Sequence, residues 1–266
     1  MARRLRLDPE DGWHHVMNRG VAKQVVFHTA HEARTFLDLL AEAAGVTGVE
    51  VHAYALMPNH YHLLVHCPAG GVSAFMQRLG ARFTQAINQH RERDGALFRG
   101  RFHSKFVDSF EYVDLVGRYI HRNPLDLRPV VALDRFRWSS YGAYVGTTVA
   151  PEWLHTAVLS DMHCGPAGYR EFVEGDSVRG RAGLGHVAIR LAVAELDDEL
   201  PDVRNRAQAE RLVAVALLER GMAADVELLG AMSPAALRTA RSRVRRRLAE
   251  QPWLTVAVER ALQLAA

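Results

Sequence analysis

The chain has 266 residues, of which 48% are hydrophobic and 24% charged, and its formal net charge at pH 7 is +3. This composition is typical of a folded globular protein and excludes a disordered or fibrous chain. No apolar run approaches the ~18 residues of a membrane span, and residues 1–6 lack the apolar core of a signal peptide. We therefore expect a cytoplasmic protein without a membrane partner.

The two cysteines, Cys67 and Cys164, lie far apart in the sequence. This spacing argues against a disulfide framework and against a thiolate zinc site. The arginines, in contrast, are clustered, at residues 3–6, 91–101 and 238–247. Because phosphate binding depends on local rather than total charge, these clusters favour a nucleic-acid partner.

Hydrophobic periodicity predicts alternating strands and helices in the first 107 residues. The expected strands are 13–18, 49–56, 60–66 and 101–107, and the expected helices are 31–44 and 72–87. The resulting order, β-α-β-β-α-β, is that of a ferredoxin-like α+β fold. We expect an antiparallel sheet with two helices on one face, and the other face free for a ligand.

Two histidines occupy alternate positions of the expected strand 60–66. Because alternate side chains of a strand point the same way, His60 and His62 share one face while Tyr61 points into the apolar layer. Two imidazoles so spaced are able to lean toward one divalent cation. The alternative is an amphipathic strand whose histidines only face solvent.

A third helix is expected from Ser109, a suitable N-cap, to the break at Asn123 and Pro124. Tyr119 and Asn123 are four residues apart and therefore share one helical face. A tyrosine at this spacing is more often part of a core than a catalyst, so the pattern alone leaves both interpretations open.

Aromatic residues at 136–146 and a helix pair within 151–174 are expected to pack on the first domain. Glycines between 175 and 185 form the best linker. The tail shows helical segments at 205–219, 224–229 and 234–250, and its last segment is rich in arginine, which is typical of a helix-turn-helix. The expected domains are 1–150, 151–200 (helical extension and linker) and 201–266 (helix-turn-helix).

Four sequence motifs, taken together, resemble the REP-associated tyrosine transposases, a branch of the HUH single-strand DNA transposases and nucleases. They are His60-Tyr61-His62, Leu97-Phe98-Arg99-Gly100-Arg101, Tyr119-Ile120-His121-Arg122-Asn123-Pro124 and Trp138-Ser139-Ser140-Tyr141. Each motif is weak alone, but four in the right order are specific. The resemblance covers residues ~13–146, and the tail from Ala207 resembles the helix-turn-helix appendix of some members.

The resemblance implies a metal-dependent enzyme that cleaves and rejoins single-stranded DNA at palindromic hairpins. Tyr119 would be the nucleophile that forms a 5′-phosphotyrosine link, and His60, His62 and Asn123 would hold Mg²⁺ or Mn²⁺. His121 is either a group that supports this site or a helix C-terminal histidine that interacts with the helix dipole. The general base for the tyrosine is not identified by the sequence.

Expected DNA contacts come from two places in the chain. Arg101 and Lys105 lie on the fourth strand, and Arg238, Arg241 and Arg245 follow one another at helical spacing in the tail. We expect a monomer or homodimer associated with the nucleoid.

Two other functions remain open. The protein is alternatively a domesticated, non-catalytic DNA-binding regulator, although the presence of His60, His62 and Tyr119 together favours the enzyme. A ferredoxin-like RNA-binding domain would need aromatic stacking residues on central strands, which only Phe102 and Phe106 resemble.

Overall fold

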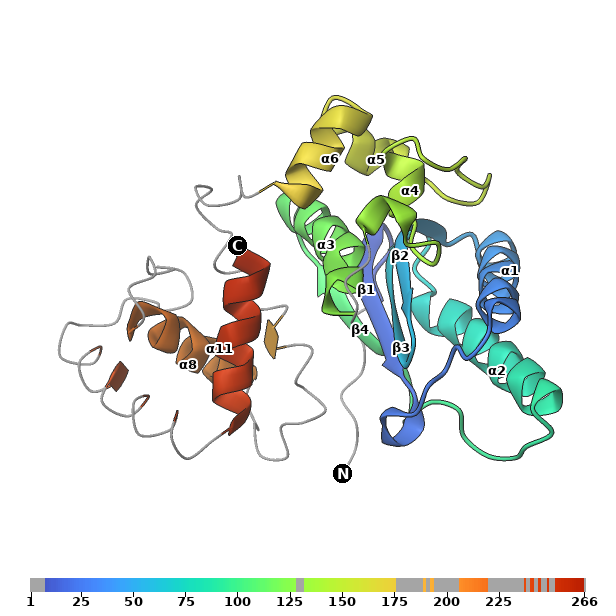
Figure 1. The fold of residues 1–266 in the computed structure, drawn as a ribbon, viewed down its shortest axis with the longest axis horizontal. Coiled ribbons are helices and arrows are strands. Elements are labelled where there is room, and N and C mark those ends of the chain that lie inside the picture. Colours follow the sequence, from blue (N-terminus) through green and yellow to red (C-terminus); the bar gives the residue numbers. More distant parts are fainter. Residues whose placement is uncertain are drawn as a thin grey trace. The chain divides into compact units, whose positions relative to one another are not determined.

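The computed structural model divides the chain into two compact units, Met1–Glu174 and Gly175–Ala266, which are described separately (Figure 1). The structure describes residues 8–127 and 132–175, and in the C-terminal part 189, 192–193, 206–219, 237, 240–241, 244, 248 and 252–265. The expected division at residues 150 and 200 stays a prediction.

A four-stranded sheet with the order β2-β3-β1-β4 lies at the centre of the first unit (Figure 1). Its strands are β1 (Gly12–Arg19), β2 (Glu50–Met57), β3 (His60–Cys67) and β4 (His103–Val107). All neighbouring strands are antiparallel. The helices α1 (Ala30–Thr47) and α2 (Val72–His90) connect β1 to β2 and β3 to β4. The predicted β-α-β-β-α-β order and α+β class are therefore confirmed.

Local sequence explains where α1 begins and ends. The Thr29 side chain accepts from the Glu32 N–H and the Glu32 side chain accepts from the Thr29 N–H, which is a capping box. Gly48 ends the helix in the left-handed conformation, with φ of 68°. The helix then packs Phe36 against Tyr61 of β3 and Phe83 of α2, with ring centroids 4.7 and 5.0 Å away.

The other face of the sheet is not free, contrary to the expectation from the sequence. Helix α3 (Phe110–Arg122) packs on β2 and β3 on the face opposite α1 and α2 (Figure 1). Ser109 caps α3 by accepting from the Tyr112 N–H, as predicted. The helix is followed by the short 3₁₀ helix η2 (Asn123–Asp126). The expectation was wrong because nine residues of α3 are buried, so this helix needs an apolar surface on which to pack.

Further short helices of the first unit follow α3. They are η3 (Leu133–Arg135), α4 (Tyr141–Tyr144), α5 (Ala157–Asp161) and α6 (Pro166–Glu174), and a 3₁₀ turn, η1 (Val21–Lys23), follows β1. Among these helices, α5 and α6 pack on α3. Arg118 of α3 donates to the Phe172 carbonyl of α6 at 2.8 Å. These contacts fix α3 between the sheet and α6.

The segment around Trp138 adds to the outer edge of β2. The Leu56 N–H donates to the Trp138 carbonyl at 2.8 Å, and the Ser140 N–H donates to the Tyr54 carbonyl at 3.0 Å. These bonds cover an edge strand that would otherwise expose unpaired backbone groups. The aromatic residues at 136–146 thus pack against the first unit, as the sequence predicted.

The described residues of the second unit are helical, with α8 (Arg206–Glu219) and α11 (Pro252–Ala265) packed on each other. Of the residues between 237 and 248, Val244 belongs to the same apolar cluster, and Leu237, Ala240 and Leu248 pack against it. Most of the segment 224–250 lies outside the described residues, so the helix-turn-helix stays a prediction. Among the described helices, none is long and apolar enough to cross a membrane.

Candidate active site

His60 and His62 lie on one face of β3, as strand alternation predicts. Their ring centroids are 5.0 Å apart and their planes are perpendicular. His60 is half-buried, at the start of the strand, whereas His62 is only 1% exposed because α3 packs over this face. The two histidines therefore form a compact pair at the edge of a covered sheet face, and His62 does not face solvent.

A third histidine joins this pair from the neighbouring strand. His15 Nε2 of β1 lies 3.0 Å from His62 Nδ1, and the two rings stack with centroids 5.2 Å apart. The register pairs Met17 with His62, so His15 is the diagonal neighbour of His62 on the same face. The sequence analysis did not identify His15 as a functional residue. Its alternation with Trp13 and Met17 was the available signal.

Helix α3 brings Tyr119 against these histidines. The Tyr119 ring centroid is 5.3 Å from that of His62 and 5.5 Å from that of His15, both in edge-to-face orientation. Tyr119 is 3% exposed. Residues from three separate segments of the chain thus meet at one point on the sheet.

Asn123 is bonded to the same turn of helix as Tyr119. Its side-chain amide donates to the Tyr119 carbonyl at 2.9 Å, and Asn123 is 3% exposed. This bond satisfies a carbonyl at the helix end and leaves Oδ1 as the amide atom that would act as a ligand. The element η2, which begins with Asn123, packs against β2.

The donor set is suited to the metal ion that the family resemblance implies. His60 Nδ1 lies 2.7 Å from Asn59 Oδ1, and His62 Nδ1 is bonded to His15, so Nε2 of each ring is the nitrogen that would coordinate an ion. Two imidazoles with one amide oxygen make an incomplete set, which leaves positions for water and phosphate oxygens. These residues therefore fit an open Mg²⁺ or Mn²⁺ site rather than a closed structural zinc site.

The two basic residues predicted on the fourth strand lie on opposite sides of the sheet. Lys105 is the register partner of His15 and its ammonium is 4.9 Å from the Tyr112 ring centroid on α3. Arg101 precedes β4 and lines a cavity of about 680 Å³ together with Tyr61 and residues of α2. The structure thus brings Lys105, but not Arg101, to the sheet face of Tyr119.

His121 does not act as a charged residue at the helix end. Its Nδ1 lies 2.8 Å from the Tyr169 hydroxyl and its Nε2 lies 2.7 Å from Ser140 Oγ, and the ring is completely buried. Burial lowers the pKa of His121 to about 3, so the ring is neutral at pH 7. The dipole interpretation is therefore wrong, and His121 ties α3 to the Trp138–Tyr141 motif and α6.

The tail residues are only partly described. Arg241 is half-buried in a helical position, while Arg238 and Arg245 lie outside the described residues. Their assignment to DNA binding stays a prediction.

The chain is similar in part to known proteins. A search of curated proteins finds no match. A solved structure of a REP-associated tyrosine transposase bound to a REP hairpin is similar, with a TM-score of 0.48 and 17% sequence identity, over 59% of this chain and 93% of that chain. Residues 10–123 match the family model "Transposase IS200 like". This match to the family model agrees with the family resemblance that the sequence motifs carry.

Proposed function

We propose that this protein is a metal-dependent endonuclease and strand-transfer enzyme that cleaves and rejoins single-stranded DNA at palindromic hairpins through a 5′-phosphotyrosine intermediate. The match of residues 10–123 to the IS200-like transposase family model supports the reaction class. One observation carries the assignment of the residues: the Tyr119 ring lies against both His62 and His15. The preference for a hairpin rests on the resemblance of the sequence motifs.

Tyr119 is the proposed nucleophile. Its phenol oxygen attacks the scissile phosphorus, the bond from phosphorus to the 3′ oxygen breaks, and the DNA 5′-phosphate stays on the tyrosine. The phenol loses one proton and the leaving 3′ oxygen gains one. Rejoining reverses these steps, because a 3′-OH attacks the phosphotyrosine and the phenol recovers its proton. Each step exchanges one phosphodiester bond for another of similar energy, so no external energy source is needed.

His60, His62 and Asn123 are the proposed metal ligands. Mg²⁺ or Mn²⁺ bound there would polarise a phosphoryl oxygen and offset the developing negative charge. The bond from His15 to His62 holds the second imidazole in a fixed orientation, and the bond from Asn123 to the Tyr119 carbonyl does the same for the amide. The same contacts therefore position the ligands and the nucleophile.

The DNA contacts are assigned in two groups. Lys105 shares the face of Tyr119 and is the proposed contact near the reacting phosphate. Arg101 lies on the other side of the sheet, so we propose that it contacts a more distant part of the DNA. Arg238, Arg241 and Arg245 of the second unit are the proposed contacts to duplex phosphates or bases.

A second function, that of a non-catalytic DNA-binding regulator, is favoured by one observation. Tyr119 is 3% exposed, so a phosphodiester reaches its hydroxyl only after the covering side chains move. A regulator that keeps the fold would have no need of this movement. The two functions differ in whether a covalent intermediate forms at all.

Trapping of the covalent intermediate tests the proposal. The full chain is incubated with a single-stranded hairpin oligonucleotide and Mn²⁺, and the product is resolved under denaturing conditions. We expect a protein–DNA adduct that requires the metal, in which a label placed 3′ of the cleavage site is retained on the protein and a label placed 5′ of it is released. Hairpin binding without any adduct would overturn the enzyme assignment and favour the regulator.

A further inference from the structure

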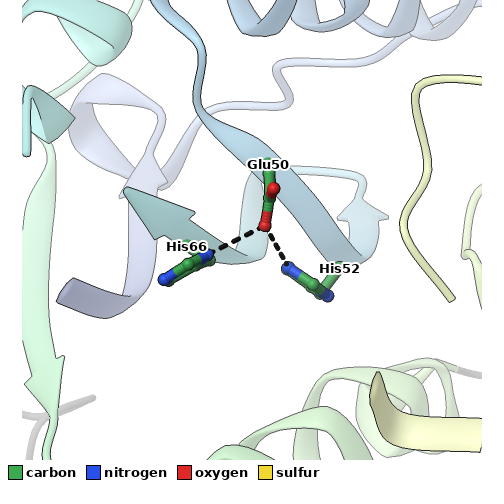
Figure 2. A group of neighbouring side chains, drawn as sticks. All are labelled: Glu50, His52 and His66. Atoms are coloured by element: carbon green, nitrogen blue, oxygen red, sulfur yellow. Dashed lines mark hydrogen bonds and ion pairs between the residues drawn. The ribbon is translucent and has the colours of Figure 1, made fainter. Parts of the chain in front are cut away.

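We propose that Glu50, His52 and His66 form a second, structural site for a transition metal of the Zn²⁺ class. Their ligand atoms all lie within 4.8 Å of one another (Figure 2). The residues come from the ends of β2 and β3 that lie away from the Pro58–Asn59 turn. This inference does not rest on the proposed enzymatic function, because none of the three residues belongs to the Tyr119 site.

The cluster is separated from the His60–His62 pair along the strand. His62 and His66 share one face of β3 but are four residues apart, which corresponds to roughly 13 Å. One ion is not able to contact both. A metal at Glu50, His52 and His66 would therefore be additional to the one proposed near Tyr119.

A β-bulge in β2 builds the cluster. The register pairs Val51 with Val65 and then Ala53 with Leu64, so His52 is an extra residue without a partner of its own on β3. A bulge changes the direction of the local side chains, and here His52 turns toward Trp13, with ring centroids 4.3 Å apart. Glu50 and His66 are direct register partners on the same hairpin. The backbone irregularity thus brings three candidate ligands together.

His52 is buried without a hydrogen bond of its own. It is 2% exposed, and neither of its ring nitrogens has a hydrogen-bond partner among the described residues. Its closest polar contact is an ion-pair distance of 3.5 Å from Nε2 to Glu50 Oε2 (Figure 2). A buried imidazole without hydrogen bonds is unfavourable, and coordination of one nitrogen to a cation beside Glu50 would reduce that cost.

His66 is held in the arrangement that metal-binding histidines commonly show. Its Nε2 lies 2.8 Å from Asp11 Oδ1 and its Nδ1 lies 2.8 Å from Glu50 Oε2. A neutral imidazole has one N–H, so only one of these two carboxylates accepts a hydrogen bond from it. The other contact brings two acceptor atoms together, and a metal ion bound to both of them would relieve their repulsion. If Nε2–H donates to Asp11, Nδ1 is the ligand atom, which is the carboxylate–histidine–metal arrangement.

The donor set selects the class of ion. Two imidazoles and one carboxylate are typical ligands of Zn²⁺ and its neighbours in the transition series, whereas Mg²⁺ and Ca²⁺ prefer oxygen alone. Three protein ligands leave one position of a tetrahedral ion for water. The exposed His155 lies near the cluster, with its ring centroid 5.7 Å from that of His52.

The site would act as a clamp on the sheet. Glu50 begins β2, His66 lies near the end of β3, and Asp11 precedes β1, while Trp13 of β1 stacks on His66 with centroids 4.7 Å apart. A bound ion would join these strand ends and stabilise the folded state by mass action. The proposed role is therefore structural.

Zinc titration of the full chain tests the proposal, with Zn²⁺ alone as the probe. Calorimetry and thermal unfolding are measured in a Cys164→Ser background, because an exposed thiol also binds zinc. We expect saturable binding and a raised Tm. His52→Ala and Glu50→Gln should each weaken this binding at least tenfold, whereas His14→Gln, a buried histidine on the other sheet face, should not.

Two further measurements distinguish loss of the metal site from misfolding of a variant and from metal binding near Tyr119. Co²⁺ bound to the unsubstituted cluster should give the intense visible absorption of a tetrahedral ion, which requires no variant to fold. The His60→Ala/His62→Ala double variant should keep this signal, and Tyr119→Phe should keep it as well. Absence of the Co²⁺ signal, or zinc affinity in the His52 and Glu50 variants equal to that of the unsubstituted protein, would overturn the metal site.

Discussion

His15 Nε2 lies 3.0 Å from His62 Nδ1, across two neighbouring strands of the sheet. If His62 coordinates a metal through Nε2, its proton is on Nδ1 and is donated to His15 Nε2. His15 then carries its own proton on Nδ1. One contact between two imidazoles therefore fixes the tautomer and the ring orientation of both residues.

We predict that His15→Ala lowers the affinity for Mn²⁺ about 10- to 100-fold, the usual effect of removing a group that orients a metal-bound histidine. The His62 ring would lose its stacking neighbour and its hydrogen-bond partner on β1. Calorimetry of the full chain with Mn²⁺ measures the affinity, and the yield of the covalent adduct should fall in parallel.

His14→Ala is the matched control for this variant. His14 is the preceding residue of β1 and is equally buried, but its side chain lies on the other face of the sheet and contacts Ser104 Oγ at 3.1 Å. Its substitution should leave Mn²⁺ affinity unchanged. Equal effects of the two variants would show that His15 acts only through the stability of the sheet.

A second prediction concerns the nucleophile. Tyr119→Phe should abolish the covalent adduct, because only the attacking oxygen is removed, while the ring contacts with His62 and His15 remain. Hairpin affinity should stay within about twofold, which corresponds to less than ~0.5 kcal/mol. Adduct formation is measured under denaturing conditions and affinity by fluorescence anisotropy.

Tyr112→Phe provides the comparison on the same helix. Tyr112 is also buried on α3 and its ring is beside Lys105, so it experiences a similar environment two turns away. We expect its adduct yield to match that of the unsubstituted protein. An adduct that persists in Tyr119→Phe and is lost in Tyr112→Phe would reassign the nucleophile.

The order of strands and helices along the chain and the His60–His62 pair could be predicted from the sequence, because both depend on local periodicity. Alternation along β3 places two histidines on one face wherever the strand lies. The four-residue spacing of Tyr119 and Asn123 likewise holds in any helix, and the structure adds a hydrogen bond between them. These features need no information about distant parts of the chain.

The contributions of His15 and His52 could not be predicted, because both depend on pairing between segments. His15 meets His62 only through the register of β1 on β3, and His52 reaches Glu50 only through a bulge in β2. The position of α3, on the sheet face opposite α1 and α2, could not be predicted for the same reason, because it depends on packing between distant segments. Its apolar face requires a partner, but the sequence does not specify which surface that is.

A third prediction follows from the buried His121. Burial lowers its pKa from 6.5 to about 3 in the folded protein, so the unfolded chain binds one more proton between these values. Stability is therefore fully present above about pH 6.5 and is lost as the pH falls, with a slope of up to about 1.4 kcal/mol per pH unit from this group. His121→Gln should remove that slope.

Denaturant unfolding at several pH values between 7 and 4.5 measures this difference. Trp253→Phe is used as the background, so that the remaining tryptophans, Trp13, Trp138 and Trp153, report on the first unit. At pH 7 the His121→Gln variant should be less stable by about 1–3 kcal/mol, because Tyr169 and Ser140 lose a buried partner. His52, whose pKa burial lowers to about 4, contributes equally to both proteins. If the free energy of unfolding fell equally steeply with decreasing pH in both proteins, His121 would not be a neutral, buried group with a lowered pKa.

The last prediction concerns the tail. If Arg238, Arg241 and Arg245 contact duplex phosphates, each arginine that is replaced by glutamine should reduce the slope of log K against log salt by about 0.9. Arg241 is half-buried beside the apolar cluster of the second unit, whereas Leu237 and Val244 of the same segment pack into that cluster. We therefore expect Arg241→Gln to change the slope less than Arg238→Gln or Arg245→Gln.

Binding to a hairpin with a long duplex stem is measured from 50 to 200 mM salt, and adduct yield is measured in parallel. Adduct formation on a short hairpin should be unchanged in all three variants, because the chemistry is assigned to the first unit. The matched comparison is Arg170→Gln, an arginine on α6 of the first unit that pairs with Asp134 and Glu174 and should not affect the slope. Salt slopes equal to that of the unsubstituted protein in all three tail variants would mean that these arginines do not contact DNA phosphates, and the tail would then be assigned to contacts with protein.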